Sequence, residues 1–177
     1  QTLFYGEKLW IADASAGLVS TADYIKFTNY TIPGPYTNNV ADIHFAGDRC
    51  FVTGGTVDNA WGNVYRPFQL FANYGNTWNS HILYGPADRD AMKVVADPAD
   101  NSHFFVSSWG NGIYEFREGE EPVNYNQYNS PLASINPGEN YTRICGLAFD
   151  KSGNLWMTQS GVPGNLKALK KDGSWIS

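Results

Sequence analysis

Residues 144–158, ICGLAFDKSGNLWMT, contain two short apolar runs separated by a polar corner at 150–154. The corner holds a glycine together with aspartate and asparagine, whose side chains bond their own backbone, and this composition is typical of a hairpin turn. Asp150, Ser152 and Asn154 also supply the oxygen ligands that hard cations prefer, so the corner alone is compatible with a cation-binding loop. The rest of the chain distinguishes the two interpretations.

The second apolar run of this segment has three counterparts elsewhere in the chain. Each copy reads apolar, aromatic, aliphatic, small, and each follows a turn; the copies are 9–12, 50–53, 104–107 and 155–158. A further apolar run precedes three of the turns, at 40–45, 91–96 and 144–149. The other three turns lack the full oxygen set of 150–154. We therefore expect Asp150 to cap a hairpin and not to bind a cation.

The spacing of the copies predicts the fold. Their aromatic residues stand at positions 10, 51, 105 and 156, so the repeat is 41 to 54 residues long, and each unit has room for four strands. Four-stranded units of about 40–50 residues are the signature of a β-propeller blade. A β-sandwich is the alternative, but it gives no reason for a fourfold repeat. We expect an all-β propeller segment with four-stranded antiparallel blades at about 1–30, 31–84, 85–128 and 129–177.

Blade packing explains two further patterns. The first strand of each blade is expected to be buried on both faces, which accounts for the apolar runs 94–96 and 147–149. The aromatic residue of the second strand is expected to fill the gap between neighbouring blades, where a large ring buries most area. Trp156 is accordingly predicted to be a core residue and not a binding platform.

Composition excludes several classes of protein. The net charge is −5 and no stripe of lysine and arginine is present, which argues against a nucleic-acid partner. No apolar run approaches the roughly 18 residues that span a bilayer, and the N-terminus does not read as a leader. We expect a soluble chain whose export signal has been removed or lies upstream. Cys50 and Cys145 are the only cysteines, which excludes a multi-cysteine zinc site.

The segment 143–158, RICGLAFDKSGNLWMT, resembles the two-component regulator propeller repeat of Bacteroidetes, with its Asp-x-x-Gly-Asn-Leu-Trp turn followed by threonine. Residues 8–19, KLWIADASAGLV, repeat the second half of that pattern. The segment 30–35 and the insertion with Gly54-Gly55 and Trp61-Gly62 are similar to the N-terminal propeller of PorZ-like proteins of the type IX secretion system. The resemblance implies a periplasmic or cell-surface module. It also implies about seven blades, so we expect a fragment of a larger propeller; the alternative is closure of four blades alone or as a homodimer.

Enzyme chemistry is not indicated by the residues, and we expect no catalytic residues, metal or cofactor. No Gly-x-Ser-x-Gly motif occurs, and Ser107 and Ser108 have no nearby base in sequence. The three histidines, at 44, 81 and 103, occupy non-equivalent positions. The acidic groups at 88–90 and 118–121 are interpreted as solvated loops. Streptogramin lyase repeats look similar around 150–158, but that resemblance implies a histidine and acids at the channel mouth, where the matching positions here are apolar apart from Asp42 and His44.

The candidate ligand-binding residues lie in loops between strands. The longest insertion, 56–66, contains Trp61, Tyr65 and Arg66, the residue types enriched at binding hot spots, and Trp109 occupies the equivalent loop of the third blade. Because loops at one face of a propeller converge, Trp61 and Trp109 are predicted to present aromatic planes to a sugar or a peptide. The alternative is that both rings fold back as blade caps.

These observations predict a recognition or docking module with a protein or glycan partner, of the PorZ-like secretion kind. A glycan-sensing propeller of a hybrid two-component regulator and a propeller lyase are the alternatives.

Overall fold

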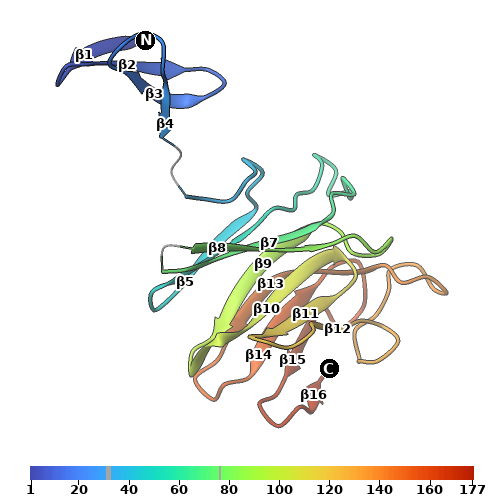
Figure 1. The fold of residues 1–177 in the computed structure, drawn as a ribbon. Coiled ribbons are helices and arrows are strands. Elements are labelled where there is room, and N and C mark those ends of the chain that lie inside the picture. Colours follow the sequence, from blue (N-terminus) through green and yellow to red (C-terminus); the bar gives the residue numbers. More distant parts are fainter. Residues whose placement is uncertain (31–32, 76) are drawn as a thin grey trace. The chain divides into compact units, whose positions relative to one another are not determined.

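The computed structural model describes residues 1–30, 33–75 and 77–177 (Figure 1). Thr31, Ile32 and Asn76 lie outside the described residues, so the expected features at 30–35 and the turn around 76 are covered only in part. The described residues form strands β1 to β16 and no helix. The chain divides into two compact units, Gln1–Gly34 and Pro35–Ser177, which are described separately.

The first unit is a single four-stranded antiparallel sheet in chain order. Its strands are β1 (Thr2–Tyr5), β2 (Lys8–Asp13), β3 (Gly17–Thr21) and β4 (Thr28–Tyr30). Trp10 on β2 packs its ring 5.1 Å from that of Tyr30, and its indole N–H donates to the carbonyl of Tyr5 at 3.1 Å. The repeated aromatic residue thus braces the sheet across its strands.

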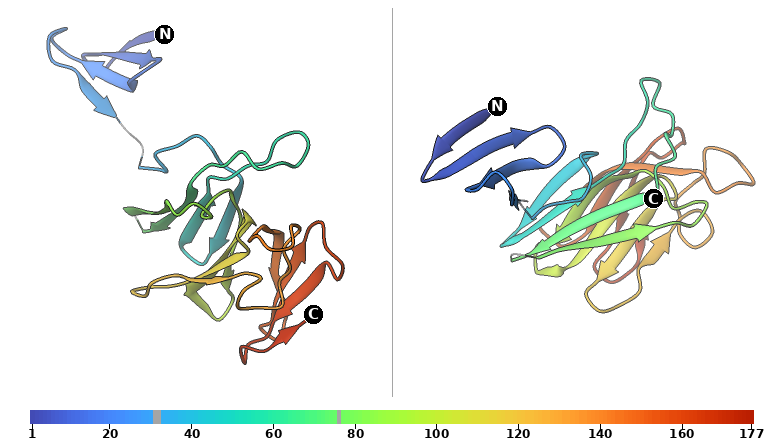
Figure 2. Two further views of the ribbon diagram at one scale, coloured as in Figure 1. Left: turned by 90° about the vertical axis from the view of Figure 1, so that its right-hand side faces the viewer. Right: turned by 45° about the horizontal axis from the view of Figure 1, so that its top comes forward.

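The second unit contains three sets of four antiparallel strands (Figure 2). The first set is β5 (Asp42–Ala46), β6 (Arg49–Thr53), β7 (Phe68–Tyr74) and β8 (Thr77–Leu83). The second is β9 (Ala91–Asp97), β10 (Asp100–Gly110), β11 (Ile113–Arg117) and β12 (Val123–Tyr125). The third is β13 (Thr142–Phe149), β14 (Leu155–Gln159), β15 (Leu166–Leu169) and β16 (Trp175–Ile176).

Strand β10 joins the second and third sets, which the sequence pattern did not indicate. It is 11 residues long, and its last two residues, Trp109 and Gly110, pair with Arg143 and Thr142 of β13. The chain turns back toward β11 at Gly112, whose φ is +76°. There an added Cβ would lie 2.0 Å from the carbonyl oxygen of Tyr125, so only glycine fits this close approach. The two sets therefore share one hydrogen-bonded sheet.

Apolar side chains fill both gaps between the three sets. Phe51 and Phe104 pack with their ring centroids 4.7 Å apart between the first and second sets, and Phe104 stacks on Phe116 at 5.2 Å. Phe105 points the opposite way, into a second cluster with Leu155 and Met157. This alternation follows from the twofold period of a strand. The prediction that second-strand aromatics fill the gaps is confirmed for Phe51 and Phe105.

Burial of the first strands is confirmed in one case and wrong in another. Residues 94–96 are buried as expected, whereas Ala148 is exposed and Phe149 is half-buried. Ala148 is exposed because the described residues of the second unit place no further sheet on its side of β13, whereas Phe149 lies on the opposite face of the strand and packs edge to face against Phe105. Trp156, which pairs with Ala148, is half-buried and belongs to neither core cluster, so the prediction that it is a core residue is wrong.

The Asp150 turn is a hairpin corner whose carboxylate is saturated by the protein. Oδ1 accepts the backbone N–H groups of Ser152 at 2.8 Å and Asn154 at 2.9 Å. Oδ2 accepts the Asn154 amide at 2.8 Å and the Trp156 indole N–H at 2.9 Å. These bonds, the one from Trp156 first, lower the pKa of Asp150 to about 2. The prediction that Asp150 caps a hairpin is confirmed.

Candidate recognition site

The insertion between β6 and β7 meets the end of β10, and this contact brings Trp61 and Trp109 together. Their ring centroids lie 6.0 Å apart at an interplanar angle of 47°. The Trp109 indole N–H donates to the carbonyl oxygen of Trp61 at 2.8 Å. Trp61 is 60% exposed, whereas Trp109 is only 3% exposed. Trp109 is therefore a buried support, and Trp61 alone of the pair presents a ring to solvent.

The side chain of Asp90 holds this loop in place. Asp90 is fully buried, and its carboxylate accepts hydrogen bonds from the Asn63 amide at 2.9 Å and from the backbone N–H groups of Tyr65 and Arg66, both at 3.1 Å. Its backbone bonds the carbonyl of Arg66 at 2.9 Å and the N–H of Trp109 at 3.0 Å. The interpretation of 88–90 as a solvated loop is wrong for Asp90, because these donors replace water around the carboxylate.

Tyr65 and Arg66 differ in how far their side chains are exposed to solvent. Tyr65 is 65% exposed, and the guanidinium of Arg89 lies over its ring, 5.0 Å from the centroid. Arg66 is half-buried and contributes through the backbone bonds already described. Tyr65 and Tyr84 line a hollow of about 300 Å³ together with Pro67, Pro86, Asp88 and Arg89. Trp61 and Tyr65 are thus the exposed aromatic residues among the four predicted site residues.

Four further residues of the site have no sequence signal of their own: Asn63, Asp90, Tyr141 and Arg143. Asn63 and Asp90 anchor the loop, and Asn63 Oδ1 accepts the Tyr141 hydroxyl. The Arg143 guanidinium lies 5.3 Å from the Trp109 ring centroid and donates to the Tyr141 hydroxyl at 2.5 Å. Asn63 is 27 residues from Asp90 and 78 residues from Tyr141 in sequence, so only the fold brings these partners together.

Ser107, Ser108 and the histidines at 44 and 81 have structural partners. Ser107 Oγ donates to the carbonyl of Cys145 at 3.0 Å, and Ser108 Oγ donates to that of Arg89 at 2.7 Å. His44 packs against Phe51, and burial lowers its pKa. His81 packs against Phe116, and burial lowers its pKa as well. In the part of the chain that the structure describes, no group of three or more histidine, cysteine, aspartate or glutamate side chains is arranged to hold a metal ion.

The third histidine, His103, lies at the opposite ends of the strands from Trp61. Its Nδ1 is 3.2 Å from Asp97 Oδ2 and its Nε2 is 2.7 Å from Glu115 Oε1. Glu115 also accepts the Tyr125 hydroxyl at 2.7 Å and an Arg117 N–H at 2.8 Å. These bonds, that of His103 first, lower the pKa of Glu115 to about 2. Burial, together with the bond to Glu115, raises the pKa of Tyr125 to about 12.

This cluster predicts a defined acid sensitivity. Ionised Glu115 contributes stability that is complete above its unfolded pKa of 4.5 and is lost as pH falls through its folded pKa of about 2. The contribution at neutral pH is about 1–2 kcal/mol after allowance for solvent screening. Urea unfolding measured between pH 5 and pH 2 should show a shallower loss of stability in Glu115→Gln than in the wild type. Glu120→Gln, in the exposed acidic run, is the matched control; parallel curves for wild type and Glu115→Gln would contradict the prediction.

Comparison with solved structures identifies the type of fold. The chain is similar to PorZ, an essential bacterial surface component of the type IX secretion system of Porphyromonas gingivalis, with a TM-score of 0.72 and 27% identity. The match covers 97% of this chain and 24% of PorZ, so the chain spans about a quarter of the length of PorZ. The fold is a β-propeller. The four-stranded sets are its blades, and the resemblance of residues 143–158 to a Bacteroidetes propeller repeat agrees with the likeness to PorZ.

Two other propeller structures resemble the chain at lower identity. The GH74 xyloglucanase of Xanthomonas campestris matches with a TM-score of 0.51 and 16% identity, over 99% of this chain and 29% of the enzyme. The extracellular domain of the hybrid two-component system BT3049 of B. thetaiotaomicron matches with a TM-score of 0.49 and 16% identity, over 96% of this chain and 22% of that one. No protein-family model and no curated protein sequence matches the chain. Among the described residues, no helix has the length and apolar character that crossing a membrane requires.

Proposed function

We propose that this chain is a non-catalytic recognition module of an extracytoplasmic Bacteroidetes protein of the PorZ kind, and that it docks a protein partner on the face that carries Trp61 and Tyr65. The observation that carries the proposal is the exposed Trp61 ring standing on the buried Trp109 indole. The likeness to PorZ supports the setting in type IX secretion.

The backbone of the loop supports a binding role for the exposed rings. Trp61 and Tyr65 both have φ of +59°, a left-handed conformation that costs free energy for side chains of this size. The surrounding bonds hold it: Asp58 Oδ1 accepts the N–H groups of Ala60 at 2.8 Å and Gly62 at 2.7 Å, and Asp90 accepts that of Tyr65. A ring fixed before binding loses little conformational entropy when a partner docks.

A glycan is the second candidate ligand, as in a glycan-sensing hybrid regulator. The observation that favours it is an exposed indole close to polar donors: Trp61 contacts Trp109, which lines a shallow hollow with Gln159, Ser160 and Asn165. An aromatic plane with amide and hydroxyl groups beside it provides both the stacking and the hydrogen bonds that sugars need.

The docking proposal predicts loss of secretion without loss of protein. In the source bacterium, a deletion of the complete gene is complemented with the wild type, with the double variant Trp61→Ala, Tyr65→Ala, or with Tyr128→Ala, which removes an equally exposed tyrosine from another loop. We expect at least a tenfold fall in secreted type IX cargo for the double variant, and wild-type secretion for Tyr128→Ala.

Equal secretion by the double variant and the wild type, at equal protein level, would refute the docking face. If the deletion itself leaves secretion intact, the secretion role is refuted. Binding of the purified full chain to a glycan array that is lost in the double variant would then select the glycan-sensing alternative.

A further inference from the structure

A third hollow lies between the β9–β12 and β13–β16 blades, at the strand ends opposite Trp61. It has a volume of about 480 Å³, which is within the range of pockets for small organic ligands. It is lined by Phe105 and Glu115 from one blade and by Leu155 and Lys170 from the other. This inter-blade groove shares no residue with the proposed docking face.

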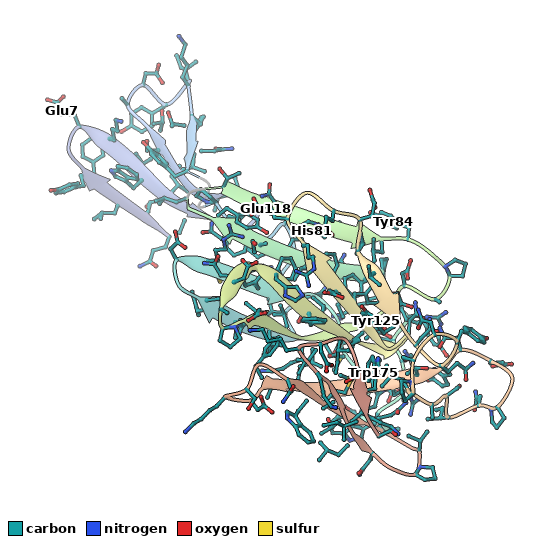
Figure 3. The ribbon with its side chains drawn as sticks, turned by 90° about the horizontal axis from the view of Figure 1, so that it is seen from below. Glu7, His81, Tyr84, Glu118, Tyr125 and Trp175 are labelled. Atoms are coloured by element: carbon teal, nitrogen blue, oxygen red, sulfur yellow. The ribbon has the colours of Figure 1, made fainter. Side chains whose placement is uncertain are left out.

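The floor of the groove is apolar. Phe105 and Phe149 meet edge to face with centroids 5.9 Å apart, and Leu155 and Leu169 complete the surface. Tyr125 and Trp175, on the outer strands of the two blades, pack edge to face at 5.9 Å (Figure 3). Phe105, Leu155 and Leu169 are buried and Phe149 is half-buried, so Phe149 is the most exposed of the four apolar side chains that a ligand in the groove can contact.

The charged side chains on the two walls of the groove differ in whether they form ion pairs. On the β9–β12 wall, Asp97 and Glu115 are bonded to His103, and Arg117 is paired with Glu115. On the opposite wall, Lys170, Lys171 and Asp172 lie at the turn before β16; neither lysine forms an ion pair among the described residues, and the carboxylate of Asp172 accepts the N–H and the hydroxyl of Ser174. The lining of the groove thus contains two lysines that form no ion pair among the described residues, and four carboxylates, each of which accepts a hydrogen bond from the protein: Asp97, Asp100, Glu115 and Asp172.

We propose that the inter-blade groove binds a monocarboxylate with an apolar body. The carboxylate pairs with Lys170 and Lys171, and the apolar body lies on Phe105 and Phe149. The ionised side chains of Asp97 and Glu115 on the far wall repel a second anionic group, so the groove discriminates against dicarboxylates. A free acid and the C-terminal carboxylate of a peptide that ends in an apolar residue share this chemistry.

The proposal does not depend on the proposed function, because the two sites occupy opposite ends of the strands. Titration calorimetry compares the binding of three compounds to the full chain. These are N-acetyl-phenylalanine, its amide, which lacks the negative charge, and N-acetyl-glutamate, which carries a second negative charge. A Gly-Ser peptide ending in phenylalanine forms a further arm. We expect the acid to bind at least tenfold more tightly than the amide and the glutamate derivative. Tighter binding of the peptide than of the acid identifies a peptide terminus as the source, and the reverse identifies a free acid.

The variant Lys170→Ser, Lys171→Ser should weaken acid binding at least tenfold at an unchanged unfolding midpoint, because Lys171 is exposed, Lys170 is half-buried and neither belongs to a strand. Lys170→Arg, Lys171→Arg should restore it, and Lys8→Ser, Lys26→Ser, which removes two exposed lysines of the first unit, should leave it unchanged. Equal binding of acid and amide, unchanged binding in the serine variant, or no binding of either the acid or the peptide would overturn the proposal.

Discussion

Alanine in place of Asp90 is expected to destabilise the protein by about 3–5 kcal/mol, since it leaves three buried donors without an acceptor. The donors are the Asn63 amide and the N–H groups of Tyr65 and Arg66. Asp90 also has φ of +46°, which aspartate and asparagine tolerate better than alanine. Urea unfolding of the full chain monitored by tryptophan fluorescence measures the loss, and the same variant should lose the function of the Trp61 face.

One further substitution and one control distinguish the contribution of the Asp90 charge to stability from the contribution of its side-chain shape. Asp90→Asn keeps one acceptor oxygen and the tolerance of positive φ, so we expect a smaller loss of about 1–2 kcal/mol. Asp172→Ala removes an exposed turn aspartate from the β15–β16 hairpin and is the matched control. If Asp90→Ala is no less stable than Asp172→Ala, the carboxylate does not hold the loop.

Truncation of Phe104 to alanine is expected to have the second large effect, about 3–5 kcal/mol. Phe104 is almost fully buried between the β5–β8 and β9–β12 blades, where it contacts Phe51 and Phe116. The variant loses the transfer free energy of the ring and opens a cavity that these flat neighbours cannot close. Phe104→Leu fills part of that space and should lose about half as much.

The control for Phe104 is Phe45→Ala, because Phe45 is 70% exposed on β5 of the same blade pair. Denaturant unfolding should show a change below about 0.5 kcal/mol for this variant. A loss below about 1 kcal/mol in Phe104→Ala would show that the two blades do not depend on this contact.

The fold was predictable because its signal is local and repeated. The turn and the aromatic residue after it, with the apolar run that precedes three of the turns, lie within about 15 residues, so four copies are recognisable without knowledge of distant contacts. The rings of Phe51 and Phe105 lie between blades as that pattern predicts. The exposure of Ala148 and the pairing of β10 with β13 depend on which surfaces face one another, and a repeat pattern does not contain that information.

For the candidate site, the sequence predicted only which residue types and which loops are involved. Trp61 and Trp109 are equivalent in the sequence, yet one is exposed and the other buried. The difference arises from Asp90, which lies in a charged tripeptide that looks like a solvated loop and is bonded to residues 24 to 27 positions earlier. The burial of a carboxylate depends on donors supplied by the fold, and therefore the anchor of the loop could not be identified from its own sequence.

The pairing of β10 with β13 also determines where the repeats can be separated. A chain cut after residue 128 would remove β13 and strip Trp109 and Gly110 of their strand partners, and the N–H of Gly112 would lose the carbonyl of Thr142. The ring that supports Trp61 would then stand at a frayed strand end. The third and fourth repeats are thus one inseparable module, and shuffling or shortening of this propeller has to keep them as a pair.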